Sequence, residues 1–406
     1  MENPKIRFKG FTKDWEQRKV SEITKFHKQG FYTTEEYDNS KKYYLLRGTD
    51  LTENKLVLKD TPKIDATEKD YDAFKTEIGD FLIVRSGTVG TYGIVDVDIP
   101  AIFGSYLIDF RFDMEQVTNE FFGYFYQSSL FKSQLNKIIQ ASANTNINAE
   151  NIKSTVISLP SLNEQRRISE YLGNLDNLIT LHQRKCEQTK KLKKYMLQKM
   201  FPRNGAKVPE IRFYGFTYDW EQRKLGEVCS RVQGNDGRMD LPTLTISAAN
   251  GWMNQEDRFS GNIAGKEQEN YTLLHKGELS YNHGNSKLAK YGTVFSLQSY
   301  KEALVPRVYH SFKVEEGSPD FLEYYFATKL PDRELGKLIS SGARMDGLLN
   351  IGYNEFMGIQ MLFPSVEEQK QISNYFRNLD HLITLHQRKC DELKKMKKYM
   401  LQNMFI

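Results

Sequence analysis

Hydrophobic positions divide the chain into two kinds of segment. In residues 163–200, seam positions recur at alternating steps of three and four, at Ile168, Leu172, Leu175, Ile179, His182 and Cys186. A later run has the same spacing, at Ile372, Phe376, Leu379, Ile383, His386, Cys390 and Leu393. Such a narrow stripe is typical of a coiled coil. At about 1.5 Å per residue, each helix would be roughly 55 Å long. A single exposed helix would leave its stripe in water, so we expect the two helices to pack on each other.

The remaining segments show a different pattern. Residues 24–156 and 229–358 contain short β-type runs interrupted by Gly and Asn, such as DFLIVRSGTVGTYGIVDV at 80–97 and GELSYNHGNSKLAKYGTVFSL at 277–297. The two segments share little sequence at matched positions. We expect each to form a globular domain of mixed α/β content.

The segments around these domains are repeated. Residues 4–23 and 209–228 agree at about 14 of 20 positions, and we call them the leading motif. Residues 160–201 and 364–405 agree at about 29 of 42 positions, and we call them the helix motif. The chain is therefore a tandem repeat in which variable and constant parts alternate.

Connectivity indicates how the helices pair. Each helix follows its own globular segment, so a two-fold relation between the halves makes the helices antiparallel, with the domains at opposite ends of a rod. Parallel packing, with both domains at one end, is the alternative. The expected fold class is α+β, with two globular domains joined by an antiparallel coiled coil and a pseudo-two-fold internal repeat. The expected boundaries are 1–156 and 203–358 for the domains, and 157–202 and 359–406 for the helices.

Composition limits the function only loosely. The net charge is +5 and the pI is about 8.7, which permits nucleic-acid binding without requiring it. Three cysteines are too few for a disulfide framework and suit a reducing cytoplasm. No run of about 18 apolar residues predicts a membrane span, and the N-terminus lacks the apolar stretch of a secretory signal.

Motifs for catalysis are absent from the sequence. It contains no P-loop, no G-x-G-x-x-G and no Asn/Asp-Pro-Pro-aromatic tetrapeptide, so we expect no catalytic residues. One constellation requires comment: His182 and Cys186 are repeated as His386 and Cys390. Across an antiparallel pair these four could approach the Cys2His2 set of a zinc site. The alternative, which we prefer, is that they are small seam residues inherited by duplication, so no metal is expected.

The repeated motifs carry a family resemblance. IRFKGFTKDWEQRKV and IRFYGFTYDWEQRKL, with LPSLNEQRRISEYLGNLDNLI and FPSVEEQKQISNYFRNLDHLI, resemble the specificity subunit of bacterial type I restriction–modification enzymes. The resemblance implies a non-catalytic subunit with two target recognition domains. It implies duplex DNA as ligand, a methyltransferase subunit in two copies, and a restriction subunit. S-adenosylmethionine, ATP and Mg would then be bound by those partners, and this chain would hold no cofactor.

Candidate DNA contacts lie in polar, Gly-rich turns. They are Arg85, Ser86, Thr88, Asn144, Thr145 and Asn146 in the first domain, and Asn282, His283, Asn285, Lys287, Arg344 and Asp346 in the second. Hairpin turns that only support a sheet would use the same residue types. Two other functions stay open: the recognition part of a self-sufficient methyltransferase, and a coiled-coil scaffold that binds proteins rather than DNA.

Candidate partner contacts lie on the helices. Outer positions that coiled-coil packing leaves free are identical in both copies, namely Gln183, Arg184, Lys185, Gln387, Arg388 and Lys389. The lysine-rich ends, KKLKKYM at 190–196 and KKMKKYM at 394–400, complement the helix dipole or contact DNA or a partner.

Overall fold

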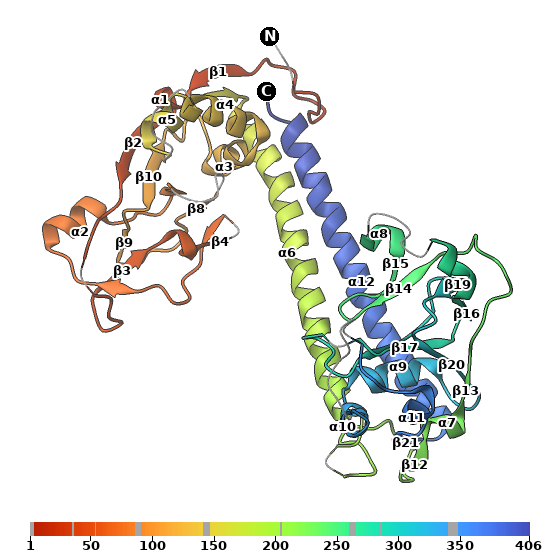
Figure 1. The fold of residues 1–406 in the computed structure, drawn as a ribbon. Helices are drawn as coiled ribbons and strands as arrows, with labels where there is room; N and C mark the ends of the chain where they lie inside the picture. The colour runs from red at the N-terminus through yellow and green to blue at the C-terminus, as the bar shows by residue number, and fades with distance from the viewer. Residues whose placement is uncertain are drawn as a thin grey trace. The chain divides into compact units, whose positions relative to one another are not determined.

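The computed structural model describes residues 4–34, 36–52, 54–85, 91–140, 147–203, 205–259, 265–284, 286–339 and 348–406. The chain forms two compact units. Residues 1–184 with 387–406 make the first domain, and residues 185–386 make the second. The long helices α6 (Leu162–Lys199) and α12 (Val366–Asn403) each contribute one part to each unit (Figure 1). The sequence boundaries at 156, 202 and 358 stay predictions, because these units are defined by contacts rather than by chain order.

The first domain is built on a six-stranded sheet of order β2-β10-β7-β8-β5-β4. A three-stranded sheet of order β6-β3-β9 and the two-stranded ribbon β1-β11 complete it. The strands are β1 (Glu16–Lys19), β2 (Thr24–Gln29), β3 (Tyr43–Leu46), β4 (Leu51–Thr52), β5 (Lys55–Leu56), β6 (Lys63–Ile64), β7 (Phe81–Val84), β8 (Tyr92–Ile94), β9 (Ala101–Phe103), β10 (Leu107–Phe112) and β11 (Val156–Leu159).

Helices of the first domain supply much of its core. They are α1 (Val20–Ile23), α2 (Glu68–Phe74), α3 (Asn119–Gln127), α4 (Ser129–Gln140), α5 (Ala149–Lys153) and the short η1 (Gly48–Asp50). Buried Phe121, Phe122 and Phe125 of α3 lie in one cluster with the sheet residues Phe81 and Phe110. The α3 run NEFFGYFYQ is buried along almost its whole length, which explains its dense aromatic composition.

The second domain repeats this plan with a four-stranded sheet of order β13-β20-β17-β18. Two-stranded sheets β12-β21, β14-β15 and β16-β19 surround it. The strands are β12 (Glu221–Lys224), β13 (Cys229–Arg231), β14 (Leu244–Ser247), β15 (Gly251–Asn254), β16 (Thr272–His275), β17 (Leu279–Asn282), β18 (Thr293–Ser296), β19 (Glu302–Val305), β20 (His310–Val314) and β21 (Gln360–Phe363). The helices are α7 (Leu225–Val228), α8 (Gln255–Phe259), α9 (Pro319–Ala327), α10 (Asp332–Lys337), α11 (Tyr353–Met357) and the short η2 (Gly265–Asn270).

Strand register makes the two sheets equivalent despite their different sequences. In the first domain β10 pairs antiparallel with β2 on one side and β7 on the other, and β7 continues to β8. In the second domain β20 pairs in the same way with β13 and β17, and β17 continues to β18. The two β-type runs singled out in the sequence are therefore the corresponding hairpins β7–β8 and β17–β18.

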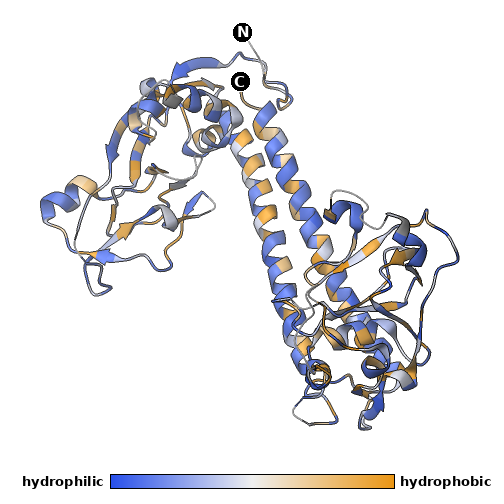
Figure 2. Ribbon diagram, in the orientation of Figure 1, coloured by the Kyte–Doolittle hydropathy of each residue, from blue (hydrophilic) through white to orange (hydrophobic). Residues whose placement is uncertain are grey.

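The helix stripe is buried, and the helices pair antiparallel within each unit. Seam residues such as Leu172 and Phe376 are fully buried. In the first domain Lys397 near the end of α12 lies 2.6 Å from Asp176 in the early part of α6. In the second domain the late α6 residue Lys193 pairs at 2.6 Å with Asp380 of α12. The antiparallel prediction is therefore confirmed, and Figure 2 shows hydrophobic positions recurring along both helices.

Each helix part also belongs to the core of its domain. Leu172, Leu175 and Ile179 share a cluster with the aromatic residues of α3. Phe376 and Leu379 do the same with the aromatic residues of α9. Apolar burial of this kind is the main favourable term in folding, so the helices are not a free rod to which domains are appended. Among the described residues, no helix is both long and apolar enough to cross a membrane.

The repeated motifs close each domain in the same way. Arg7 makes a bidentate ion pair with Glu164, at 2.7 and 2.8 Å, and Arg212 makes the equivalent pair with Glu368, at 2.7 Å for both contacts. Strand β1 pairs with β11, and β12 pairs with β21. The variable part of each domain therefore begins and ends at a constant junction.

The Gln of the Glu-Gln dipeptide secures the same junction. Gln165 accepts a hydrogen bond from the Thr118 main chain at 2.9 Å and donates to the Pro160 carbonyl at 3.0 Å. Gln369 repeats both bonds with Ser318 and Pro364, each at 3.1 Å. These contacts explain why Pro, Glu and Gln keep their spacing in both copies.

Candidate nucleic-acid interface

The predicted DNA contacts divide between described and undescribed positions. Asn282 is the last residue of β17, and Arg85, His283 and Lys287 lie in the connections that follow the equivalent strands β7 and β17. The other candidates, Ser86, Thr88, Asn144, Thr145, Asn146, Asn285, Arg344 and Asp346, lie outside the described residues. The structure therefore places four candidates at corresponding sheet edges, and their contact with DNA stays a prediction.

Arg85 makes its contacts within its own domain. Its main-chain N–H donates to the Tyr106 carbonyl at 2.9 Å, and its Nη1 lies 3.5 Å from the Ser105 carbonyl. Its Nε is buried and has no hydrogen-bond partner among the described residues. The guanidinium therefore lies beneath the turn that joins β9 to β10 rather than projecting into solvent.

His283 and Asn282 are similarly engaged in the second domain. His283 is buried, with Nδ1 2.8 Å from the Leu349 carbonyl and Nε2 2.9 Å from the Val308 carbonyl. The Asn282 amide donates to the Ile246 carbonyl at 3.2 Å, and its Oδ1 accepts from the Gly284 main chain at 3.0 Å. Both side chains fix loop geometry, whereas the exposed Lys287 is available to a ligand.

A second histidine supports the same region. His310 lies 2.8 Å from the Ile351 carbonyl through Nε2, and its ring stacks on His283 with centroids 4.9 Å apart. Burial lowers the pKa of His310, and the neighbouring His283 and Arg231 act in the same direction. The neutral ring is therefore favoured in the folded domain.

Sequence reasoning missed exposed residues beside these connections. Tyr106 is 70% exposed in the β9–β10 turn, and Arg307 and Val308 are exposed in the β19–β20 turn. Tyr32, 74% exposed, follows Phe31, which bridges to Gly104 at the base of the first turn. A lone aromatic or Arg outside a Gly-rich run carries no sequence signal, because its exposure depends on pairing between distant strands.

The predicted partner contacts are all exposed. Gln183, Arg184 and Lys185 lie on the surface of α6, and Gln387, Arg388 and Lys389 lie on the surface of α12. Their partner role stays a prediction. The sequence reasoning missed the leucines nearby: Leu178 and Leu181 are 43% and 44% exposed, and their repeats Leu382 and Leu385 are 41% and 49% exposed.

The lysine-rich helix ends have two kinds of lysine. Lys193 and Lys397 make the ion pairs described above, whereas Lys191, Lys194, Lys394, Lys395 and Lys398 are exposed.

Cys186 is buried and donates to the Ile383 carbonyl at 3.8 Å, as expected for a seam residue. Across the part of the chain that the structure describes, no group of three or more His, Cys, Asp or Glu residues is arranged to hold a metal ion.

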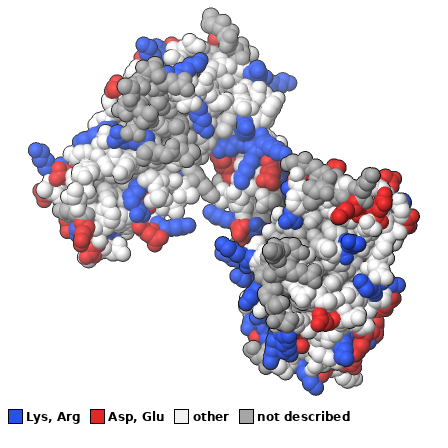
Figure 3. Space-filling view, in the orientation of Figure 1, with Lys and Arg blue, Asp and Glu red and all other residues white. Residues whose placement is uncertain are grey.

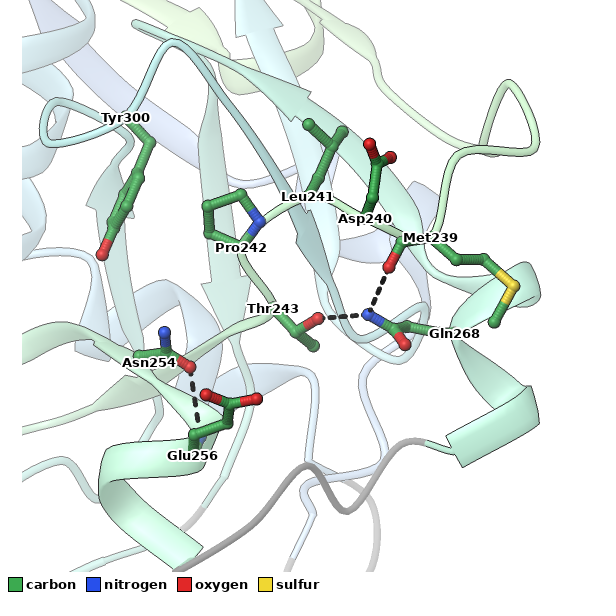
Figure 4. Close-up of a pocket in the computed structure, with 9 residues that line it drawn as sticks. All are labelled: Met239, Asp240, Leu241, Pro242, Thr243, Asn254, Glu256, Gln268 and Tyr300. Carbon is green, nitrogen blue, oxygen red and sulfur yellow. Dashed lines mark hydrogen bonds between the residues drawn. The ribbon is translucent and has the colours of Figure 1, made fainter.

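The pocket of the second domain does not suit nucleic acid. A pocket of about 340 Å³ in the second domain is lined by Asp240 and Glu256, with Gln268 bonded to Thr243 across its floor (Figure 4). Its two carboxylates would repel phosphate.

The first-domain pocket, about 290 Å³, is lined by Arg111 and Glu77 and by the buried Asp109. Burial raises the pKa of Asp109 to about 8, and the charge of Asp80 adds to this effect.

Charge is mixed on the face of each domain that Figure 3 draws. Figure 3 shows Lys and Arg on the visible face of each domain, with Asp and Glu interspersed.

Comparison with known proteins identifies the architecture. The family model "Type I restriction modification DNA specificity domain" matches residues 12–191, which is the first copy of the repeat. The MjaVIII type I restriction enzyme specificity subunit of Methanocaldococcus jannaschii is 32% identical over 102 residues, and the match spans 25% of this chain and 24% of that subunit.

Two further proteins are similar over most of their length. The putative MjaX specificity subunit of the same organism is 22% identical over 415 residues, covering 96% of this chain and 92% of that subunit. The crystal structure of a type I restriction–modification S subunit from M. genitalium superposes with a TM-score of 0.60 at 16% identity, covering 100% of this chain and 99% of that chain. That structure has the same fold.

Proposed function

The chain belongs to the DNA specificity subunits of type I restriction–modification systems, and we propose that each of its domains recognises one half of a bipartite, asymmetric DNA site. One observation carries this proposal: equivalent sheets present different loops from matching junctions. The junctions Arg7–Glu164 and Arg212–Glu368 match, whereas the connections after β7 and β17 share little sequence. Two recognition domains that share a scaffold but differ in their loops suit two half-sites of different sequence.

Partner subunits, rather than this chain, would then carry out the chemical steps on DNA. The family is non-catalytic, and methylation and DNA cleavage belong to partner subunits of the complex. We propose a methyltransferase subunit in two copies and a restriction subunit as partners, with S-adenosylmethionine, ATP and Mg bound there. DNA recognition by this chain, and methylation and cleavage by its partners, would take place in the cytoplasm, where the DNA is accessible.

The methyltransferase would dock on the repeated outer face of the helices. Leu178 and Leu181, with Arg184 beside them on α6, recur on α12 as Leu382 and Leu385 with Arg388. Exposed apolar side chains flanked by Arg are typical of a protein interface. Because the same set occurs once on each helix, two copies of one partner would find equivalent surfaces.

A charge reversal tests this docking face. Changing both Arg184→Glu and Arg388→Glu should weaken assembly with the methyltransferase while the chain stays folded. The matched control reverses Arg166 and Lys370, exposed basic residues at equivalent positions of the same helices and outside the predicted surface. Co-purification that is unchanged in the Arg variant, or lost equally in both variants, would count against the assignment.

Methylation mapping tests the function itself. The chain and its methyltransferase, expressed in a host without other adenine methylation, should methylate a split site whose two halves differ in sequence. Binding of duplex DNA should weaken with salt, because phosphate contacts release counterions. A continuous target, or no salt-sensitive DNA binding at all, would contradict the proposal and favour a scaffold that binds only proteins.

A further inference from the structure

We propose that the β9–β10 turn and the β19–β20 turn are DNA-reading elements, with Tyr106 contacting one half-site and Arg307 the other. The proposal rests on the proposed function and specifies which described residues perform it. Neither residue lies in the Gly-rich connections that the sequence singles out.

The two turns occupy the same place in equivalent sheets. The Leu107 main chain donates to the Gly104 carbonyl at 2.8 Å, and the Tyr309 main chain donates to the Pro306 carbonyl at 3.0 Å. The strands that follow are β10 and β20, each paired on both sides within its sheet. Ser105–Tyr106 and Arg307–Val308 are therefore corresponding apex residues.

The first turn is held rigidly by neighbouring main chain. Gly104 donates to the Leu46 carbonyl at 2.9 Å, and Gly30 donates to the Leu107 carbonyl at 3.0 Å. The approach requires glycine at position 30, because a Cβ there would lie 2.1 Å from the Gly104 carbonyl oxygen. A rigid turn presents its side chain without the entropic cost of ordering a loop on binding.

The apex side chains are exposed and available. Tyr106 is 70% exposed, and Arg307 is exposed. Among the described residues neither side chain makes a hydrogen bond, ion pair or ring contact. Tyrosine supplies a large contact at low entropic cost, and arginine pairs with the O6 and N7 of guanine. One turn therefore offers an aromatic hydroxyl and the other a bidentate cation, which suits two half-sites of different sequence.

Arg85 and His283 are positioning residues for these turns. In the sheet registers Val84 lies opposite Leu107, and Tyr281 lies opposite His310. Continued along the strands, these registers set Arg85 opposite Tyr106 and His283 opposite Val308, so the two residues occupy corresponding places. Arg85 lies under the carbonyl of Ser105, and His283 contacts the carbonyl of Val308. Each side chain therefore fixes the turn that carries the reading residue of its own domain.

Binding to altered half-sites tests the proposal. The complex with the methyltransferase is measured on three duplexes: the mapped site, the site with the first half scrambled, and the site with the second half scrambled. Tyr106→Ala should weaken binding of the intact site by roughly 5- to 150-fold, yet leave binding unchanged where the first-domain half-site is already scrambled. Arg307→Ala should show the converse pattern.

Controls remove similar groups from the far ends of the same strands. Met114→Ala, where Met114 is 50% exposed beyond β10, and Lys313→Ala in β20 should leave all three affinities unchanged. Tyr106→Phe separates the hydroxyl from the ring. A melting temperature close to that of the unmodified chain shows that each variant is folded, and Tyr106→Ser provides a second variant for that position.

His283→Ala should reduce discrimination between the intact and scrambled sequence only in the half-site that Arg307 contacts. His283→Gln should restore part of this discrimination, because the Gln amide can donate to the Val308 carbonyl. Equal losses on all three duplexes with a reduced salt dependence would mean phosphate contact and overturn the reading role. Unchanged affinities would overturn it as well. In both cases a mapped bipartite site would leave the proposed function standing, whereas a wild-type complex without such a site would remove that function.

Discussion

Loss of the Arg7–Glu164 ion pair should open the junction that closes the first domain. The Glu164 side chain is 2% exposed and the Arg7 side chain 13% exposed, so Arg7→Ala leaves a buried carboxylate without its partner. Breaking a buried pair costs about 3–5 kcal/mol. The equivalent substitution Arg212→Ala should cost as much in the second domain, where the exposed fractions are 1% for Glu368 and 15% for Arg212.

Hydrogen exchange is the suitable assay, because a chain of two domains does not unfold in one step. A loss of 3 kcal/mol in local stability corresponds to roughly 150-fold faster exchange. Arg7→Ala should accelerate exchange in β1 and β11 and leave β12 and β21 unchanged. Glu170→Ala, which removes an exposed pair, should have almost no effect. Restoring slow exchange with Arg7→Met and Glu164→Leu together would support the reasoning. An Arg7→Ala variant as stable as Glu170→Ala would refute it.

Other substitutions test burial and backbone geometry. Burial raises the pKa of Asp109 to about 8, whereas the group ionises near pH 4 in the unfolded chain, so the first domain should lose up to about 6 kcal/mol of stability as pH rises from about 4 to 8. Asp109→Asn should remove this decline from first-domain exchange, and a decline of equal size in the variant would exclude Asp109 as its source. His310 has a lowered pKa, so second-domain stability should fall as pH drops below about 6.5 and stay level in His310→Gln. Gly30→Ala should destabilise the first domain by about 3 kcal/mol, since its Cβ meets main chain. Gly173→Ala, whose Cβ would make an ordinary 3.5 Å contact, should stabilise α6 by about 0.5–1 kcal/mol, measured by the same hydrogen exchange.

The constant parts of the fold were predictable from sequence for a physical reason. Helix periodicity is local, so the stripe through Leu172 and Phe376 predicts both helices, and duplication predicts their antiparallel pairing. The mixed α/β content of the domains also follows from local patterns. The stripe does not reveal that its residues also pack against α3 and α9. The aromatic residues of those helices are distant in sequence, so a local pattern cannot show this contact.

The candidate site was less predictable because it depends on strand pairing. Gly and Asn correctly indicate the connections after β7 and β17, but they do not distinguish a reading side chain from a supporting one. His283 has a polar side chain in a turn, yet it is buried between two carbonyls. Tyr106 has no local signal, and its position beside Arg85 arises only when β10 pairs with β7.

Exchange of one domain tests the central claim most directly. Residues 24–156 are replaced by the corresponding segment of another specificity subunit, and the methylated sites of cells carrying the hybrid and the methyltransferase are sequenced. Because constant junctions border the exchanged segment, we expect one half of the methylated site to change and the half read by residues 229–358 to persist. A hybrid that folds and assembles but methylates a site altered in both halves would contradict the claim that each domain recognises its own half-site.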